Sequence, residues 1–378
     1  MKFIHISDLH LGKRVNEFSM LEDQKDILNK ILKIIGEENP QGLLIAGDIY
    51  DKSIPTVEAI QLFDEFLCQL SKKKVPAFII SGNHDSAERI AFGGRLMKES
   101  GVYVAPAYSG KTNAITLEDE WGPVHIYLLP FVKPVNVKRF FEDDSIESYT
   151  DAVQCAVKQM NLNSDERNIL VTHQFVTGAK RSESEDISVG GTDNVDVSVF
   201  DGFDYVALGH IHGPQKIGRE TVRYCGTPLK YSFSEIHHEK SVTIVEMKEK
   251  GNVEIRTRKL EPLRDWCEIK GIYMKLTEKS YYENLDRESY MHVTLTDEED
   301  IPEAVRKLQV IYPNLMKLDY DNQRTRGKSS FAEIEEVEEK TPYDIFEELY
   351  EKQNNQPMSE EQTQLIQNLV EQIWEGGH

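Results

Sequence analysis

Residues 43–51 have the sequence LLIAGDIYD, a short apolar run that ends in glycine and two carboxylates. A run of this length, closed by turn residues, is typical of a buried strand. The same arrangement recurs along roughly the first 215 residues, where each apolar run is followed by Gly, Ser or Thr and then by polar side chains. The five runs are residues 3–6, 43–46, 77–80, 169–171 and 205–208.

Helical patterns lie between the first three of these runs. Apolar residues recur there at the spacing of one helix face, and Ser19 and Thr56 stand where N-caps are expected. The apolar positions are Ile27, Ile31, Ile34 and Ile35 in one segment and Ile60, Phe63, Leu67 and Leu70 in the other. Strands and helices in alternation predict an α/β fold built in layers.

Two changes of pattern divide the chain into three expected parts. Strands at residues 242–246 and 253–255 complete the first part. The expected parts are a catalytic domain over residues 1–261, a small domain over residues 262–332, and an acidic linker with a pair of helices over residues 333–378.

The second and third parts have their own element signals. In the second, strand-like residues 291–295 and 315–318 flank a helical segment at 304–311, which predicts a small α+β domain. In the third, Thr341 and Ser359 each begin a capping pattern, which predicts two short helices.

The net charge of −21 weighs against a polyanionic partner such as DNA. The charge is unevenly spread, because residues 331–378 contain thirteen Asp and Glu against two Lys. The remainder still sums to −10, so DNA binding would need metal ions, basic patches or a partner protein. The basic side chains nearest the polar loops could contact phosphates or simply be solvated; they are Lys13 and Arg14, Lys133, Lys138 and Arg139, and Lys180 and Arg181.

The sequence lacks the features of secreted and membrane proteins. No apolar run approaches twenty residues, and the charged Lys2 directly precedes a strand-like segment, which argues against a membrane span and a signal peptide. The four cysteines lie far apart without a C-x-x-C pair, so a disulfide framework is not expected. We therefore expect a soluble, cytoplasmic protein with no membrane partner.

Each of the five apolar runs leads into residues that can bind metals or transfer protons. Loops that leave the carboxyl ends of strands in an α/β sheet meet at one edge, so these residues can come together. They are Asp8 and His10, Asp48 and Asp51, Asn83, His84 and Asp85, His173, and His210 and His212.

Seven of these residues are of metal-ligand type, too many for one ion. Imidazole, carboxylate and amide groups without thiolates suit Mn, Fe or Zn. Two ions about 3.5–4 Å apart form the clamp that is used for phosphoryl displacement. Asp48 is the natural bridge, since a carboxylate can offer one oxygen to each ion.

The ordered motifs resemble the signature of the calcineurin-like metallophosphoesterases. The signature residues are Asp8-x-His10, Gly47-Asp48-x-x-Asp51, Gly82-Asn83-His84-Asp85, His173 and Gly209-His210-x-His212. More narrowly, residues 3–12 and 209–228 resemble the SbcD family of bacterial nucleases, and the resemblance extends over essentially the whole chain. It implies a layered β-sandwich flanked by helices, a small α+β capping domain and a C-terminal helix pair.

The resemblance also implies a role for each motif residue. One ion would be held by Asp8, His10, Asp48 and His212, and the other by Asp48, Asn83, His173 and His210. His84 would lie beside the scissile phosphate as a catalytic residue, and Asp85 would orient its ring. The expected cofactor is a pair of divalent ions, Mn²⁺ by preference.

The function implied by the resemblance is that of a DNA nuclease, acting as a 3′-to-5′ exonuclease on double strands and as an endonuclease on single strands and hairpins. The C-terminal helices would bind an SbcC-type, SMC-like ATPase, and two copies of the chain would form a homodimer within a heterotetramer. No G-x-x-x-x-G-K-[ST] motif is present, so any dependence on ATP must come from the partner.

Two other functions are considered beside the nuclease. One is a small-molecule phosphodiesterase or phosphatase of the same superfamily, which would not need the capping domain and the helix pair. The other is a non-catalytic scaffold, which would have no reason to retain seven ligands and an acid. The role of Asp51 stays open between a residue that orients a ligand and a turn cap. Isolated histidines such as His5 are expected to be structural.

Overall fold

Every predicted ligand lies in the first of two compact units, Met1–Asp265. The computed structural model describes residues 1–141, 145–182, 184–185 and 193–329, together with residues 343, 346, 347, 349, 350, 358, 359, 361–366 and 369. The second unit spans Trp266–His378.

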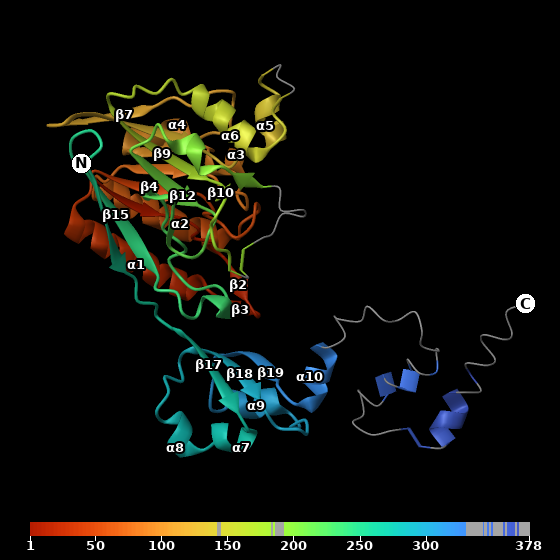
Figure 1. The fold of residues 1–378 in the computed structure, drawn as a ribbon. Helices are drawn as coiled ribbons and strands as arrows, with labels where there is room; N and C mark the ends of the chain where they lie inside the picture. Colours follow the sequence, from red (N-terminus) through yellow and green to blue (C-terminus); the bar gives the residue numbers. More distant parts are fainter. Residues whose placement is uncertain are drawn as a thin grey trace, which may run out of the picture. The chain divides into compact units, whose positions relative to one another are not determined.

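Among its described residues, the first unit is built on two six-stranded sheets (Figure 1). The order of the first sheet is β16 (Val253–Lys259), β15 (Ser241–Met247), β1 (Lys2–Ile6), β4 (Gly42–Ala46), β5 (Ala77–Ile80) and β6 (Val102–Val104). The order of the second is β13 (Gln215–Ile217), β14 (Arg219–Tyr224), β12 (Tyr205–Gly209), β9 (Arg167–His173), β8 (Gly122–Leu129) and β7 (Ile115–Asp119).

The two sheets pack face to face as a sandwich. Phe3 and Leu44 of the first sheet share one core cluster with Ile126 and Val171 of the second. All five residues of β4 are buried, because this strand is covered on both faces. Burial on both faces explains why the parallel strands are continuously apolar instead of alternating.

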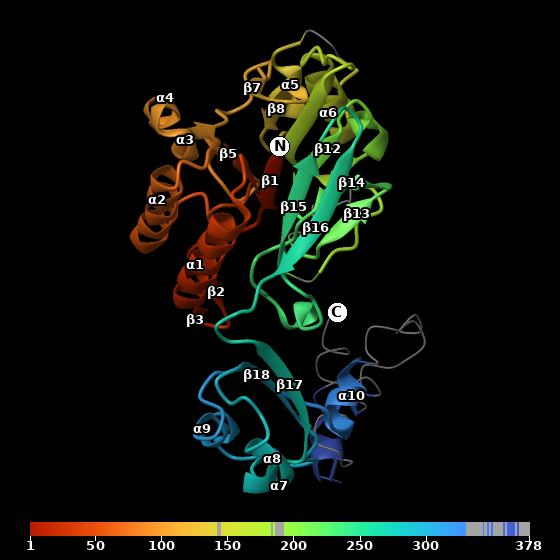
Figure 2. The same cartoon turned by 90° about the vertical axis from the view of Figure 1, so that its left-hand side faces the viewer.

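Helices cover the outer faces of the sandwich, with α1 (Leu21–Glu38) and α2 (Val57–Lys72) on one side and α5 (Pro134–Lys138) and α6 (Tyr149–Lys158) on the other (Figures 1 and 2). Thr56 caps α2 as predicted, since its side chain accepts a hydrogen bond from the Ala59 N–H at 3.3 Å.

The prediction of Ser19 as the cap of α1 is wrong. The N-cap residue is Met20, because Ser19 is still paired in a short hairpin.

The shorter elements of this unit are β2 (Arg14–Val15), β3 (Phe18–Ser19), α3 (Ala87–Ile90), α4 (Gly94–Met97), η1 (Lys98–Ser100), β10 (Phe175–Val176), β11 (Asn194–Val195), η2 (Val197–Phe200) and η3 (Phe233–Glu235).

The five apolar runs are strands, as predicted, but they do not belong to a single sheet. The runs in β1, β4 and β5 lie in the first sheet, whereas those in β9 and β12 lie in the second. The strands are parallel within each group. The predicted convergence of loops therefore takes place across the sandwich and not along one open sheet.

The second unit contains a parallel sheet of β17 (Trp266–Gly271), β18 (Tyr290–Leu295) and β19 (Leu315–Tyr320). Its helices are α7 (Tyr273–Leu276), α8 (Lys279–Tyr282), α9 (Ala304–Gln309) and α10 (Gln323–Ser329). The predicted strands β18 and β19 and the helix α9 are confirmed. Strand β17 was not predicted, because Glu268 and Lys270 interrupt its apolar pattern.

The predicted C-terminal helix pair lies mostly outside the described residues. Of those that are described in this segment, residues 361–366 are helical. Within the described part of the chain, no helix combines the length and the apolar character needed to cross a bilayer.

Candidate metal centre

The loops that follow β1, β4, β5, β9 and β12 bring all seven predicted ligands together. The first two loops are joined by backbone hydrogen bonds, from the Asp8 N–H to Gly47 O and from the His10 N–H to Asp48 O, both at 3.0 Å. The two sheets are joined at the same edge, where His173 Nδ1 lies 2.8 Å from Ala46 O. Ligands from distant parts of the sequence thus share one site.

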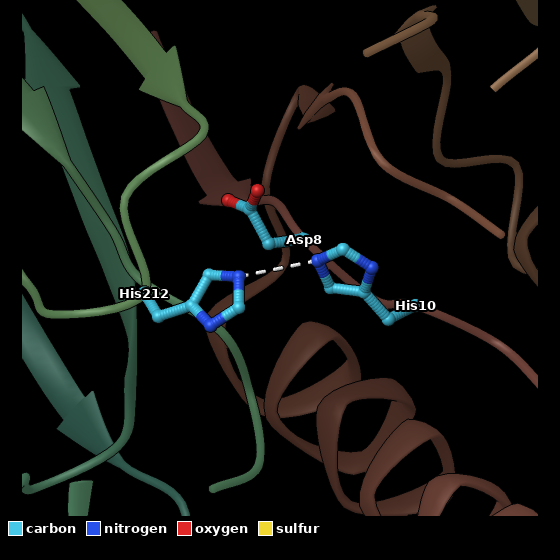
Figure 3. Close-up of side chains that lie close together, drawn as sticks. All are labelled: Asp8, His10 and His212. Atoms are coloured by element: carbon cyan, nitrogen blue, oxygen red, sulfur yellow. Dashed lines mark hydrogen bonds between the residues drawn. The ribbon is translucent and has the colours of Figure 1, made fainter. Parts of the chain in front are cut away.

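Asp8, His10 and His212 form the first half of the site (Figure 3). Their ligand atoms lie within 4.8 Å of one another, and the Nε2 atoms of His10 and His212 are 3.2 Å apart. His212 Nδ1 faces two acceptors, Ser184 Oγ at 2.7 Å and Glu235 Oε1 at 3.3 Å. Its Nε2 therefore turns a lone pair toward His10, an arrangement that fits a cation between the rings.

Asp48, Asn83, His173 and His210 form the second half. The Nδ1–H of His173 donates to the backbone, and its Nε2 lies 3.2 Å from Asp48 Oδ2 and 2.9 Å from Asn83 Oδ1. His210 Nδ1 also lies 2.9 Å from Asn83 Oδ1. An imidazole nitrogen buried against a carboxylate oxygen and an amide oxygen needs a proton or a cation between them, so these residues also fit a metal ion.

Asp48 stands between the two halves. Its Oδ2 atom lies 3.2 Å from His173 Nε2 and 3.9 Å from His10 Nε2. A carboxylate oxygen of Asp48 lies within 4.8 Å of ligand atoms of Asp8 and His173. The same holds for ligand atoms of His10 and His84. Oδ2 is thus the oxygen that lies between the two halves, since Oδ1 accepts from the His84 backbone N–H at 3.0 Å.

Burial and mutual charge set the protonation of the site. Burial raises the pKa of Asp8 to about 6 and lowers the pKa of His210 to about 3. Burial also holds the pKa of His10 well below its usual range. Burial alone would raise the pKa of Asp48, but attraction to His173 holds it well below its usual value. Burial would lower the pKa of His173, but attraction to Asp48 raises it to about 9, so His173 shares a proton with Asp48 that a bound cation would displace. The site thus offers neutral His10 and His210 imidazoles and an ionised central carboxylate, the forms that bind metals.

The backbone at the ligands is strained. Asp8, His10, Asp48 and His210 all have positive φ angles, of 54°, 45°, 49° and 109°. Such conformations are uncommon for residues other than glycine and persist where the surrounding structure enforces them, often at functional sites.

His84 lies at the margin of the cluster. Its side chain is 23% exposed and its Nε2 is 4.0 Å from Asp48 Oδ2, whereas His10 and His173 are buried. An exposed ring next to buried ligands can reach a substrate. His84 Nδ1 faces the backbone oxygen of Asp51 at 3.2 Å.

The hydrogen bonds of Asp85 do not match the predicted role of orienting His84. Its carboxylate accepts hydrogen bonds from the backbone N–H groups of Ile49, Tyr50 and Gly82, at 2.9–3.1 Å. A carboxylate can accept hydrogen bonds from several loop N–H groups at once. Asp85 thereby joins the loop after β5 to the loop after β4.

Asp51 lies near the predicted ligand His10. Its Oδ1 accepts from Lys13 Nζ at 2.8 Å and lies 3.8 Å from His10 Nδ1. Lys13 is therefore engaged in an ion pair inside the site, and Arg181 is likewise paired with Asp193. The distance to His10 exceeds that of a hydrogen bond, so the role of Asp51 stays open between the two alternatives.

The residues behind His212 were not predicted from the sequence. Ser184, Glu235 and Lys240 are joined there in one buried network. Burial would raise the pKa of Glu235, but attraction to Lys240 holds it well below its usual range. No spacing pattern links these residues to the ligand motifs, so only the fold reveals them.

Comparisons with known proteins match both parts of the chain. Residues 1–214 match the family model for calcineurin-like phosphoesterases, and residues 253–354 match the model described as the type 5 capsule protein repressor C-terminal domain. The chain is 33% identical over 376 residues to a Staphylococcus epidermidis protein named as the SbcD component of the nuclease SbcCD, covering 98% of each chain.

Solved structures with related folds are more distant. A dimetal phosphatase from Danio rerio is 14% identical over 69% of this chain and 99% of its own, with a TM-score of 0.38. A Thermus thermophilus structure is 13% identical over 68% and 98% of the two chains, also with a TM-score of 0.38. Structural similarity at this level does not support an assignment. The assignment rests on the family models and on the near full-length match to the Staphylococcus epidermidis protein. The chain belongs to the calcineurin-like phosphoesterase family and, within it, to the SbcD proteins.

Proposed function

We propose that the chain is the DNA nuclease component of an SbcCD-type complex and hydrolyses phosphodiester bonds with two divalent metal ions, preferably Mn²⁺. The observation that carries the proposal is the pair of buried ligand groups around Asp48, one with paired imidazole nitrogens 3.2 Å apart and one with His173 facing Asn83. The name of the Staphylococcus epidermidis relative supports the choice of a nuclease.

The ligands divide between the two ions by their place around Asp48. Asp8, His10 and His212 would hold the first ion, and Asn83, His173 and His210 the second, with Asp48 shared. When bound, two such ions polarise the phosphodiester, generate the attacking nucleophile from water and stabilise the charge of the transition state.

The residues of the chain fix the geometry of this reaction. The buried ligands exclude bulk water from one side, which strengthens the electrostatic interactions at the phosphate. His84 would contact the scissile phosphate, a role supported by its partly exposed ring, which lies against His10 with ring centroids 4.9 Å apart. It would stabilise the transition state or protonate the leaving oxygen.

Membership of the family supports a proposal for the substrates and partners. We propose 3′-to-5′ exonuclease activity on double-stranded DNA and endonuclease activity on single strands and hairpins. An SbcC-type ATPase would supply the dependence on ATP, and two copies of the chain would form a homodimer within the complex. Metal ions and a partner would also offset the net charge of −21, which opposes DNA binding.

The purified chain tests the proposal when it is incubated with Mn²⁺ and either a hairpin DNA or a chromogenic phosphodiester. Cleavage of the hairpin that stops on chelation is the expected result, and His84→Gln is the matched inactive control. Hydrolysis of the small ester alone would replace the nuclease with a small-molecule phosphodiesterase. Hydrolysis of neither substrate, with no metal bound, would favour a scaffold.

A further inference from the structure

A buried ion pair lies directly behind His212 and outside the predicted ligand set. Glu235 ends η3 and Lys240 precedes β15, and their side chains are 0% and 4% exposed. Lys240 Nζ and Glu235 Oε2 are 2.5 Å apart. Removing two charges from water costs on the order of several kcal/mol per ion, so a buried pair is weak evidence for a purely stabilising role.

Glu235 reaches the imidazole of His212 on the side away from His10. Its Oε1 lies 3.3 Å from His212 Nδ1 and accepts from the Ser184 hydroxyl at 2.5 Å. Because the Ser184 hydrogen points at the carboxylate, Ser184 Oγ accepts from His212 Nδ1 at 2.7 Å. Both neighbours of Nδ1 are therefore acceptors, so Nδ1 carries the hydrogen and Nε2 keeps its lone pair.

The side chain of Lys240 binds the backbone of His212. Its Nζ donates to His212 O at 2.9 Å, to Thr227 Oγ1 at 2.6 Å and to Glu235 Oε2. Three acceptors satisfy the three N–H bonds of the ammonium group. One ion pair thus fixes both the ring and the main chain of His212.

We propose that Glu235, held in place by Lys240, is a positioning residue that fixes the tautomer and the orientation of His212 for metal binding. The inference rests on the proposed two-ion function. A carboxylate behind a metal-binding imidazole restricts the ring and raises its basicity. The ion held with Asp8 and His10 should therefore depend on Glu235, and the ion on the other side of Asp48 should not.

Glu235→Gln tests this dependence because it removes the charge and keeps the shape. Binding of Mn²⁺ alone, measured by equilibrium dialysis and fitted to two sites, should weaken by about 10–100-fold at one site and stay at the parental affinity at the other. The electron paramagnetic resonance signal of a coupled pair of Mn²⁺ ions should disappear at low metal concentration. Cleavage of single-stranded DNA should fall in parallel and recover as Mn²⁺ is raised.

Asp119→Asn is the matched control, since it breaks another ion pair, with Arg167, at the amino ends of the strands. It should lower thermal stability without changing either Mn²⁺ affinity. Ser184→Ala removes only the hydroxyl bridge and should weaken the same site by a smaller factor, which keeps the test open if Glu235→Gln does not fold. Parental affinity at both sites in the folded variant would overturn the proposal. Failure of the parent to bind Mn²⁺ would instead refute the proposed function.

Discussion

At the scale of single residues, Asp48 is the group on which both halves of the metal centre depend. It is 2% exposed, and its Oδ2 lies between His10 and His173. We predict that Asp48→Asn loses more bound Mn²⁺ than His10→Ala or His173→Ala, because the neutral amide removes a negative charge that both ions would share. Metal analysis after dialysis measures the loss. Equal losses in the three variants would remove the case for a bridging carboxylate.

His84 gives a second prediction at this scale, because its ring is exposed next to buried ligands. His84→Gln should bind two ions and DNA nearly as the parent does but cleave DNA about 10²–10⁴ times more slowly, as expected when a general acid is removed. Single-turnover cleavage and Mn²⁺ dialysis on the same preparation separate the two effects. If the variant loses an ion, His84 is a ligand.

At the scale of elements, the metal centre depends on how closely the two sheets approach at β4 and β12. A Cβ atom on Gly209, the last residue of β12, would lie 1.8 Å from Ala46 O and 2.7 Å from His173 Nδ1. Gly209→Ala should therefore force the sheets apart and cost about 1–3 kcal/mol of unfolding free energy, with a loss of Mn²⁺ affinity. Urea denaturation and metal dialysis measure both quantities.

Gly36 in α1 provides the matched control for Gly209. A Cβ atom there would meet only the end of the flexible Lys73 side chain, at 3.4 Å. Gly36→Ala should raise the unfolding free energy by about 0.5–1 kcal/mol, because alanine favours helix interiors, and should leave the metal affinity unchanged. An equal loss of unfolding free energy and Mn²⁺ affinity in both variants would mean that the effect does not come from the close contact at Gly209.

The amino ends of the strands are joined by the buried side chain of Arg167. Arg167 donates to Asp119 and to Lys248 O, and the N-terminal ammonium also pairs with Asp119. Burial would raise the pKa of Asp119, but the hydrogen bonds from Arg167 and the N-terminus hold it well below its usual value of 3.8.

Asp119→Asn should therefore cost about 3 kcal/mol near pH 7, because it leaves Arg167 without its counter-charge. A depressed carboxyl pKa stabilises the fold above the unfolded pKa, and this contribution is lost as the pH falls below about 3.8. The difference in unfolding free energy between parent and variant should thus shrink between pH 5 and pH 2, a range of about three units. A constant difference across that range would contradict the ionic explanation.

At the scale of the whole molecule, the C-terminal segment is predicted to bind the ATPase partner. The sequence predicts a final helix with apolar residues on one face, and among the described residues Leu365 and Phe346 are 59% and 39% exposed. Deleting residues 341–378 should leave Mn²⁺-dependent cleavage of single-stranded DNA near its parental rate and abolish co-purification with an SbcC-type ATPase. A loss of the chain's own activity or thermal stability would place the segment in the catalytic core instead.

The sequence by itself determined the strands and the types of the ligands. Apolar runs such as β4 could be predicted because a strand covered on both faces must be apolar throughout. Asp8, Asp48 and His173 could be identified because each follows such a run. The strand β17 could not be predicted, since Glu268 and Lys270 remove the apolar signal.

Only the tertiary structure decided how these residues meet. The strand pattern predicted that the ligand loops meet at the edge of a sheet, whereas the ligands come from two sheets whose contact at Gly209 no local pattern encodes. The network of Glu235 and Lys240 behind His212, and the bonds of Asp85 to loop N–H groups, also join residues that are distant in sequence or lack a motif. The chemical types of the ligands can be recognised from local sequence spacing. The orientation of their side chains depends on packing between segments that only the folded chain brings together.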